Sequence, residues 1–129
     1  MNTDSGRDPP EQPLPRAPRI LVVDADSACA ALLEQWLSEA AFDVVHDADV
    51  GAPLDLAIVD VPQPRSGGTR SVRLIADRHP GTPILAVSSV FFPGIEHCTA
   101  APRMLGADAV LPKPMSRETL LHHVRRLLK

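Results

Sequence analysis

Four side chains that can do chemistry each lie at the end of an apolar run of the sequence. In chain order they are Asp24 after RILVV, Asp60 after LDLAIV, Ser88 within PILAVSS, and Lys113 after DAVLP. A carboxylate at the end of a buried strand is costly unless a partner pairs with it. Two acids, a hydroxyl and an ammonium therefore predict a charged site, provided that the fold brings the four runs together.

The acidic stretch VVDADSA has two interpretations. It is either a pair of site acids, Asp24 and Asp26, or one site acid followed by a helix N-cap. Asp is among the best capping residues, because its carboxylate accepts backbone N–H groups of the first helical turn. We favour the cap for Asp26, since an amphipathic segment begins directly after it.

The four side chains are positioned by an alternation of apolar runs and amphipathic segments. Short apolar runs rich in β-branched residues are typical of strands buried on both faces. Apolar residues at i, i+3, i+4 and i+7 are typical of helices with one buried face. We predict strands over 19–23, 42–46, 54–61, 83–89 and 108–112, and helices over 27–40, 69–79 and 116–129. The segment 99–105 is a poor helix, because Pro102 lies inside it.

The helix faces are predicted from the same spacing. The apolar face of the first helix includes Cys29, Leu32 and Leu33, and that of the second includes Leu74 and Ile75. Because Cys29 lies in this stripe, we expect a buried, reduced thiol.

Strands that alternate with helices predict a parallel sheet with right-handed crossovers. Five strands suit the doubly wound α/β order 2-1-3-4-5, in which a site forms where the carboxyl ends of strands 1 and 3 meet. Only residues 47–54 separate the second strand from the third, so we expect the helix between them to be missing. Its loss should uncover part of one sheet face and one side of helix 69–79, and such a patch usually marks an interaction surface.

Composition narrows the class of protein. The chain has 129 residues, enough for one domain, and a formal net charge of −3 without a large basic block, which argues against nucleic-acid binding by this domain. Neither a signal peptide nor a membrane span is recognisable, so we expect a cytoplasmic protein with no membrane partner. Residues 1–18 contain five prolines and are predicted to be a disordered leader before a domain over 19–129.

Four motifs, in order, resemble the receiver domain of response regulators in two-component signalling, the CheY-like family. They are ILVVDAD, DLAIVDVPQPRSGG, TPILAVSS and GADAVLPKP, and each lies at a predicted strand end. The resemblance covers about residues 19–129 and implies a flavodoxin-like fold.

The resemblance implies a role for each matching residue. By position these are the phosphoacceptor Asp60, the acidic-turn residue Asp24, a backbone-carbonyl metal ligand at Pro62, the switch hydroxyl Ser88, the phosphoryl-charge partner Lys113, and a cis peptide before Pro114. A carboxylate can attack phosphorus, while Mg²⁺ and the ammonium offset charge on the phosphoryl oxygens. Mg²⁺ is held through one or two carboxylates and waters in such sites.

Two departures from the family pattern bear on function. The second turn acid, a metal ligand in the family, is replaced by Ala25, and Asp26 is either the N-cap favoured above or a displaced metal ligand. We therefore expect Mg²⁺ binding to be weak or absent. The aromatic switch residue of the last strand is replaced by Val110, so a rotating aromatic ring cannot report phosphorylation from that position. Phe91 and Phe92 either fill the space that the aromatic leaves or are simply core, which we favour.

These departures favour an atypical receiver domain that acts as a signalling or protein-interaction module, with weakened or absent Mg-dependent phosphorylation. The alternative is a conventional receiver phosphorylated on Asp60 by a histidine kinase. Partners would be a histidine kinase or another signalling protein, with a homodimer left open, and no enzyme activity is expected. A flavin-binding enzyme is disfavoured, because the turn after the first strand carries carboxylates where a phosphate needs N–H donors.

Overall fold

The computed structural model describes residues 17–24, 26–46, 53–61, 70–92, 94–97 and 100–128. The predictions made for Ala25, for Pro62 and for residues 1–16 of the leader lie outside these ranges.

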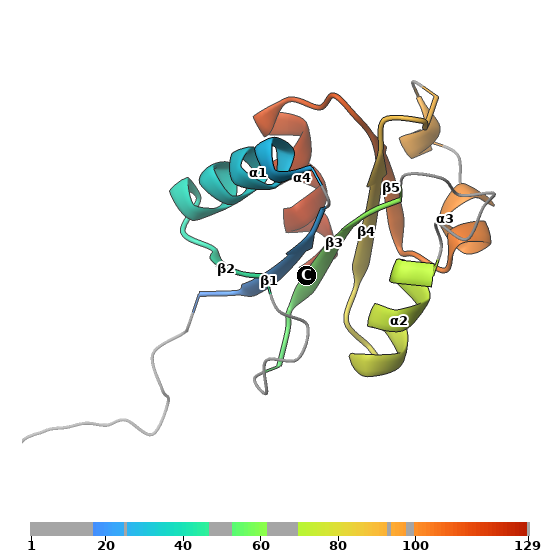
Figure 1. Ribbon diagram of the computed structural model, residues 1–129, viewed down its shortest axis with the longest axis horizontal. Coiled ribbons are helices and arrows are strands. Elements are labelled where there is room, and N and C mark those ends of the chain that lie inside the picture. Colours follow the sequence, from blue (N-terminus) through green and yellow to red (C-terminus); the bar gives the residue numbers. More distant parts are fainter. Residues whose placement is uncertain are drawn as a thin grey trace, which may run out of the picture.

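Strands and helices alternate along the chain as predicted (Figure 1). The strands are β1 (Arg19–Val23), β2 (Asp43–Val45), β3 (Leu56–Asp60), β4 (Ile84–Ser88) and β5 (Ala109–Pro112). The helices are α1 (Ser27–Glu39), α2 (Arg70–Arg78), α3 (Ala100–Leu105) and α4 (Arg117–Leu127), with a short 3₁₀ helix, η2 (Ile95–His97). Within the ranges described, none of the helices is both long and apolar enough to cross a bilayer.

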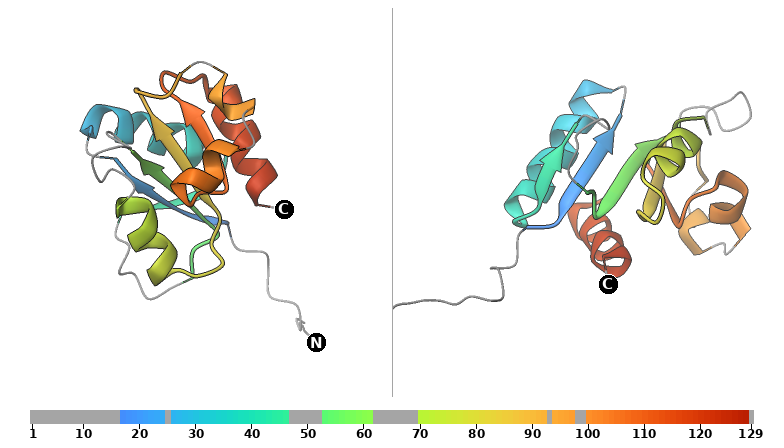
Figure 2. Two further views of the ribbon diagram at one scale, coloured as in Figure 1. Left: turned by 90° about the vertical axis from the view of Figure 1, so that its right-hand side faces the viewer. Right: turned by 90° about the horizontal axis from the view of Figure 1, so that it is seen from below.

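The five strands form one parallel sheet in the order β2-β1-β3-β4-β5, which confirms the predicted doubly wound fold. Helices α1 and α4 cover one face, and α2 and α3 cover the other (Figures 1 and 2). Alternate strand residues enter two separate apolar layers: Ile58 packs with α1 and α4, whereas Val59 packs with α2. Burial on both faces explains why the strands read as continuous apolar runs.

The connection between β2 and β3 contains no helix in its described part, which is His46 and Pro53–Asp55. We predicted that the loss of this helix uncovers part of one sheet face, but at Leu21 in β1 the sheet is fully buried. Leu54 from the short connection is also buried and lies in the same apolar cluster as Leu21. On α2, by contrast, Leu74 is 47% exposed, so one side of that helix is uncovered, as predicted.

Helix faces were predicted less well than helix positions. Leu33 and Leu37 are buried in α1, but Leu32 is 43% exposed and Cys29 is only partly buried. Successive helical residues differ by about 100° around the axis. A wide apolar stripe therefore leaves its marginal members, such as Leu32, in solvent.

Helix α3 forms although Pro102 lies inside it. Pro102 is the third residue of Ala100–Leu105, and backbone N–H groups in the first helical turn have no acceptor within the helix. The missing proline N–H therefore removes no hydrogen bond from the helix. The short helix η2, which buries Ile95, was not predicted.

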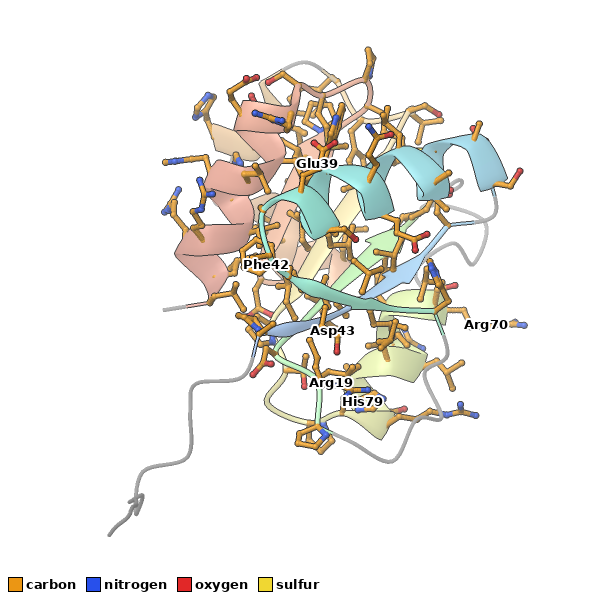
Figure 3. The ribbon with its side chains drawn as sticks, turned by 90° about the vertical axis from the view of Figure 1, so that its left-hand side faces the viewer. Arg19, Glu39, Phe42, Asp43, Arg70 and His79 are labelled. Carbon is orange, nitrogen blue, oxygen red and sulfur yellow. The ribbon has the colours of Figure 1, made fainter. Side chains whose placement is uncertain are left out.

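A Schellman cap ends α1. The N–H of Phe42 donates to the carbonyl of Leu37 at 3.0 Å, and the N–H of Ala41 donates to the carbonyl of Ser38 at 3.0 Å. Ala41 has φ 70°, a left-handed conformation that normally favours glycine. The cap turns the chain into β2, where Arg19 Nη1 lies 3.8 Å from Asp43 Oδ2 across the β1–β2 pair (Figure 3).

Candidate functional site

Three of the predicted site residues meet at the carboxyl ends of the strands. The Lys113 Nζ lies 2.8 Å from Asp24 Oδ2 and 2.9 Å from Asp60 Oδ1. The side chains are largely buried: Asp24 is 1% exposed, Asp60 13% and Lys113 14%. A single ammonium therefore joins two carboxylates that come from different strands.

The sheet order positions these groups. Asp24 follows β1 and Asp60 ends β3, and the two strands are neighbours with Val23 paired to Val59. Lys113 follows β5, which is separated from β3 by β4, and its backbone N–H donates to the carbonyl of Ser88 at 3.0 Å. The four-carbon stem of lysine then spans the distance from β5 to the two acids.

Asp26 points away from this ion pair. Its Oδ1 accepts the backbone N–H groups of Ala28 at 3.0 Å and Cys29 at 3.3 Å, which makes it the N-cap of α1. Its own N–H donates to Asp24 Oδ1 at 2.9 Å. Both oxygens of Asp24 thus accept hydrogen bonds, one from the Asp26 backbone and one from Lys113.

The ion pair sets the ionisation of its members. Burial by itself would raise the pKa of Asp24, but hydrogen bonds from Lys113, from the Asp26 N–H and from the Cys29 thiol outweigh it and lower that pKa. Burial would lower the pKa of Lys113, but the carboxylates of Asp24 and Asp60 raise it well above its usual range. At neutral pH, Asp24 is therefore an anion and Lys113 a cation.

Sequence reasoning did not assign Cys29 to the site. It lies in the first turn of α1, and its thiol helps to lower the pKa of the Asp24 carboxyl group. Burial, together with this carboxylate, raises the pKa of the thiol. Its position in the sequence could have indicated this role, because a side chain in the first turn of a helix lies over the segment that precedes the helix.

Ser88 is fully buried at the end of β4, and its hydroxyl accepts the backbone N–H of Val90 at 3.2 Å. Ion pairs thus join Asp24, Asp60 and Lys113, whereas the Ser88 hydroxyl is engaged by the backbone of Val90. The Lys113–Pro114 peptide bond is cis, the conformation that the resemblance implied.

The position at which the family has its aromatic switch residue lies in the core. Val110 is 1% exposed and belongs to the same buried cluster as Phe91. The expectation that both phenylalanines are core is wrong for Phe92, which is 59% exposed. Adjacent residues in this turn point in different directions, and only one of the two rings faces the sheet.

The described residues fit a resident Mg²⁺ ion poorly. Such an ion needs open carboxylate oxygens, whereas Lys113 holds an oxygen of each site acid and Asp26 caps α1. No group of three acidic, histidine or cysteine side chains in the described ranges is arranged to hold a metal. The site as observed is an internally paired charge cluster.

Comparisons with known proteins identify the family. The sequence is 30% identical over 118 residues to the transcriptional regulatory protein CpxR of Escherichia coli K12, and 33% identical over 120 residues to CusR of the same organism, each match covering 86% of this chain. The chemotaxis protein CheY4 of Vibrio cholerae has the same fold, with a TM-score of 0.69, 26% identity and coverage of 87% of this chain and 99% of that chain. The chain belongs to the receiver domains of two-component signalling.

This receiver domain spans about half the length of the curated relatives that it matches, 49% of CpxR and 51% of CusR. A CheY-like receiver domain of Methanospirillum hungatei, 24% identical, matches the fold with a TM-score of 0.70 and coverage of 87% and 94% of the two chains. No family model matches the sequence.

Proposed function

We propose that this is an atypical receiver domain, a signalling and protein-interaction module in which Mg-dependent phosphorylation of Asp60 is weakened or absent. The observation that carries the proposal is the pairing of both site acids, Asp24 and Asp60, with the ammonium of Lys113. A site that is already paired internally attracts a divalent cation less than a cluster of free carboxylates does.

The acidic turn supports the same conclusion. Alanine at position 25 offers no side-chain oxygen, and the carboxylate of Asp26 is used as a helix cap. Asp24 is thus the one acid of the turn that faces Asp60. A hard cation binds less tightly when fewer oxygen ligands, with less negative charge, surround it.

A conventional phosphoacceptor is the second candidate function. It is favoured by Asp60, which is 13% exposed at a strand end beside an ammonium. A carboxylate oxygen can attack phosphorus, and the ammonium can stabilise charge that develops on the phosphoryl oxygens. On this alternative a histidine kinase supplies the phosphoryl group.

The proposed partners are a histidine kinase or another signalling protein, with a second copy of the chain as a further candidate. CpxR and CusR are named as transcriptional regulators. We propose no nucleic-acid or membrane binding by this domain itself, no enzyme activity and a cytoplasmic location.

Intact mass spectrometry after incubation with acetyl phosphate tests the function. We expect little or no adduct in the wild type with Mg²⁺, and no adduct in the matched variant Asp60→Asn. Ala25→Asp restores the missing acid and should increase the adduct. A labile phosphate adduct that forms fully on the wild type, depends on Mg²⁺ and is lost in Asp60→Asn would instead establish the conventional function.

A further inference from the structure

We propose that Lys113 is the resident counter-cation of this site, and that its ammonium keeps divalent metal ions out. The inference rests on the proposed function and explains why the site would bind Mg²⁺ weakly. It assigns the effect to a group that is present, the ammonium, in addition to the acid that position 25 lacks.

The geometry places the ammonium where a bridging metal would have to bind. Nζ lies 2.8 Å from Asp24 Oδ2 and 2.9 Å from Asp60 Oδ1, so it is held between one oxygen of each acid. A Mg²⁺ ion that used the same two oxygens would need to lie about 2.0–2.1 Å from each. The two cations cannot share that position.

The other oxygen of Asp24 is also in use. Asp24 Oδ1 accepts the N–H of Asp26 at 2.9 Å, and rotating the carboxylate to free Oδ2 would break this hydrogen bond. Asp24 is 1% exposed, so water cannot easily replace a lost partner. A metal ion must therefore displace Lys113 before it can use Asp24.

Lys113 is held in a position in which it can compete with a metal ion for the two carboxylates. Its backbone N–H is tied to the carbonyl of Ser88 at 3.0 Å, and its side chain is 14% exposed. The two carboxylates and the ammonium together carry one net negative charge, compared with two when the ammonium is removed. Removing the Lys113 ammonium therefore empties the position between the two carboxylates and doubles the net negative charge of the site.

A titration with Mn²⁺ tests the inference without any phosphorylation. Binding is measured by the paramagnetic broadening of amide NMR signals. The variants are Lys113→Gln and the charge-matched control Arg117→Gln, whose arginine pairs with Glu39 at 3.2 Å and is 51% exposed. We expect Lys113→Gln to bind Mn²⁺ at least ~10-fold more tightly than the wild type. Arg117→Gln should behave like the wild type.

Equal affinity of the wild type and Lys113→Gln would overturn the inference, as would an equal gain in Arg117→Gln, since overall charge would then explain the effect. Failure here leaves the proposed function standing, because the mass experiment tests Asp60 separately. Conversely, a full Mg-dependent adduct on the wild type would overturn the proposed function directly.

A measurement on the wild type covers the case in which Lys113→Gln does not fold. The chain has two lysines, Lys113 and Lys129, so ¹⁵N-labelled ammonium signals are readily assigned. We expect the Lys113 signal to exchange slowly with water and to stay in place when millimolar Mg²⁺ is added. A shift or loss of that signal, with Lys129 unchanged, would show that Mg²⁺ displaces the ammonium and would overturn the inference.

Discussion

Replacing Lys113 by methionine tests the ion pair as a structural element. The variant keeps the apolar stem but leaves Asp24 and Asp60 without their shared cation. Removing one partner of a buried ion pair typically costs about 3–5 kcal/mol. Lys113 and Asp60 are 14% and 13% exposed, and because water replaces part of the loss we expect a drop of about 2–4 kcal/mol in the free energy of unfolding.

Urea unfolding followed by Trp36 fluorescence measures this drop. The double variant Asp24→Asn/Lys113→Met removes both charges of the shorter contact and should recover at least half of the loss, because no unpaired anion stays buried beside α1. A loss below about 1 kcal/mol in Lys113→Met, which is the range of an exposed salt bridge, would refute the reasoning. So would a double variant that is no more stable than the single one.

We expect Lys113→Met also to change the way in which the stability of the protein depends on pH. In the wild type the folded pKa of Asp24 lies below the ordinary value of 3.8, so this stabilisation is present above that value and is lost as the pH falls through the folded pKa. In Lys113→Met, burial opposes only the hydrogen bonds from Asp26 and Cys29. The acid-induced loss of stability should therefore shrink, and an equally steep loss would contradict the assignment.

The remaining predictions concern the two ends of α1. Ala41→Gly should raise the free energy of unfolding by about 1 kcal/mol, because φ 70° strains alanine; the control Ala40→Gly, at φ −90°, should not stabilise. Asp26→Ala should lower it by about 1 kcal/mol through loss of the N-cap, while Asp26→Asn keeps the acceptor and most of the stability. Urea unfolding measures all four variants. A neutral Ala41→Gly would contradict the strain, and an unchanged Asp26→Ala would contradict the cap.

Much of the fold was readable from local patterns. The apolar runs predicted all five strands, and their alternation with helices predicted a parallel sheet and the order of its strands. The cap at Asp26 was also predictable, because the N–H groups that donate to its carboxylate belong to Ala28 and Cys29, only two and three residues further along the chain. These features depend on backbone periods and on contacts between neighbours in the sequence.

Tertiary structure decided which side chains meet. The Lys113–Asp24 contact joins residues 89 positions apart, and no local pattern indicates that one ammonium serves both acids. Cys29 was predicted to be a buried thiol; it packs partly buried against the core, and its effect on the pKa of Asp24 was not predicted. The missing crossover helix was predictable, but the burial of Leu21 and Leu54 in one apolar cluster was not. The sequence alone thus determined the sheet and the strand ends at which the charged groups lie. How those charges pair was decided by the tertiary structure, because pairing depends on distances of a few ångströms between distant segments.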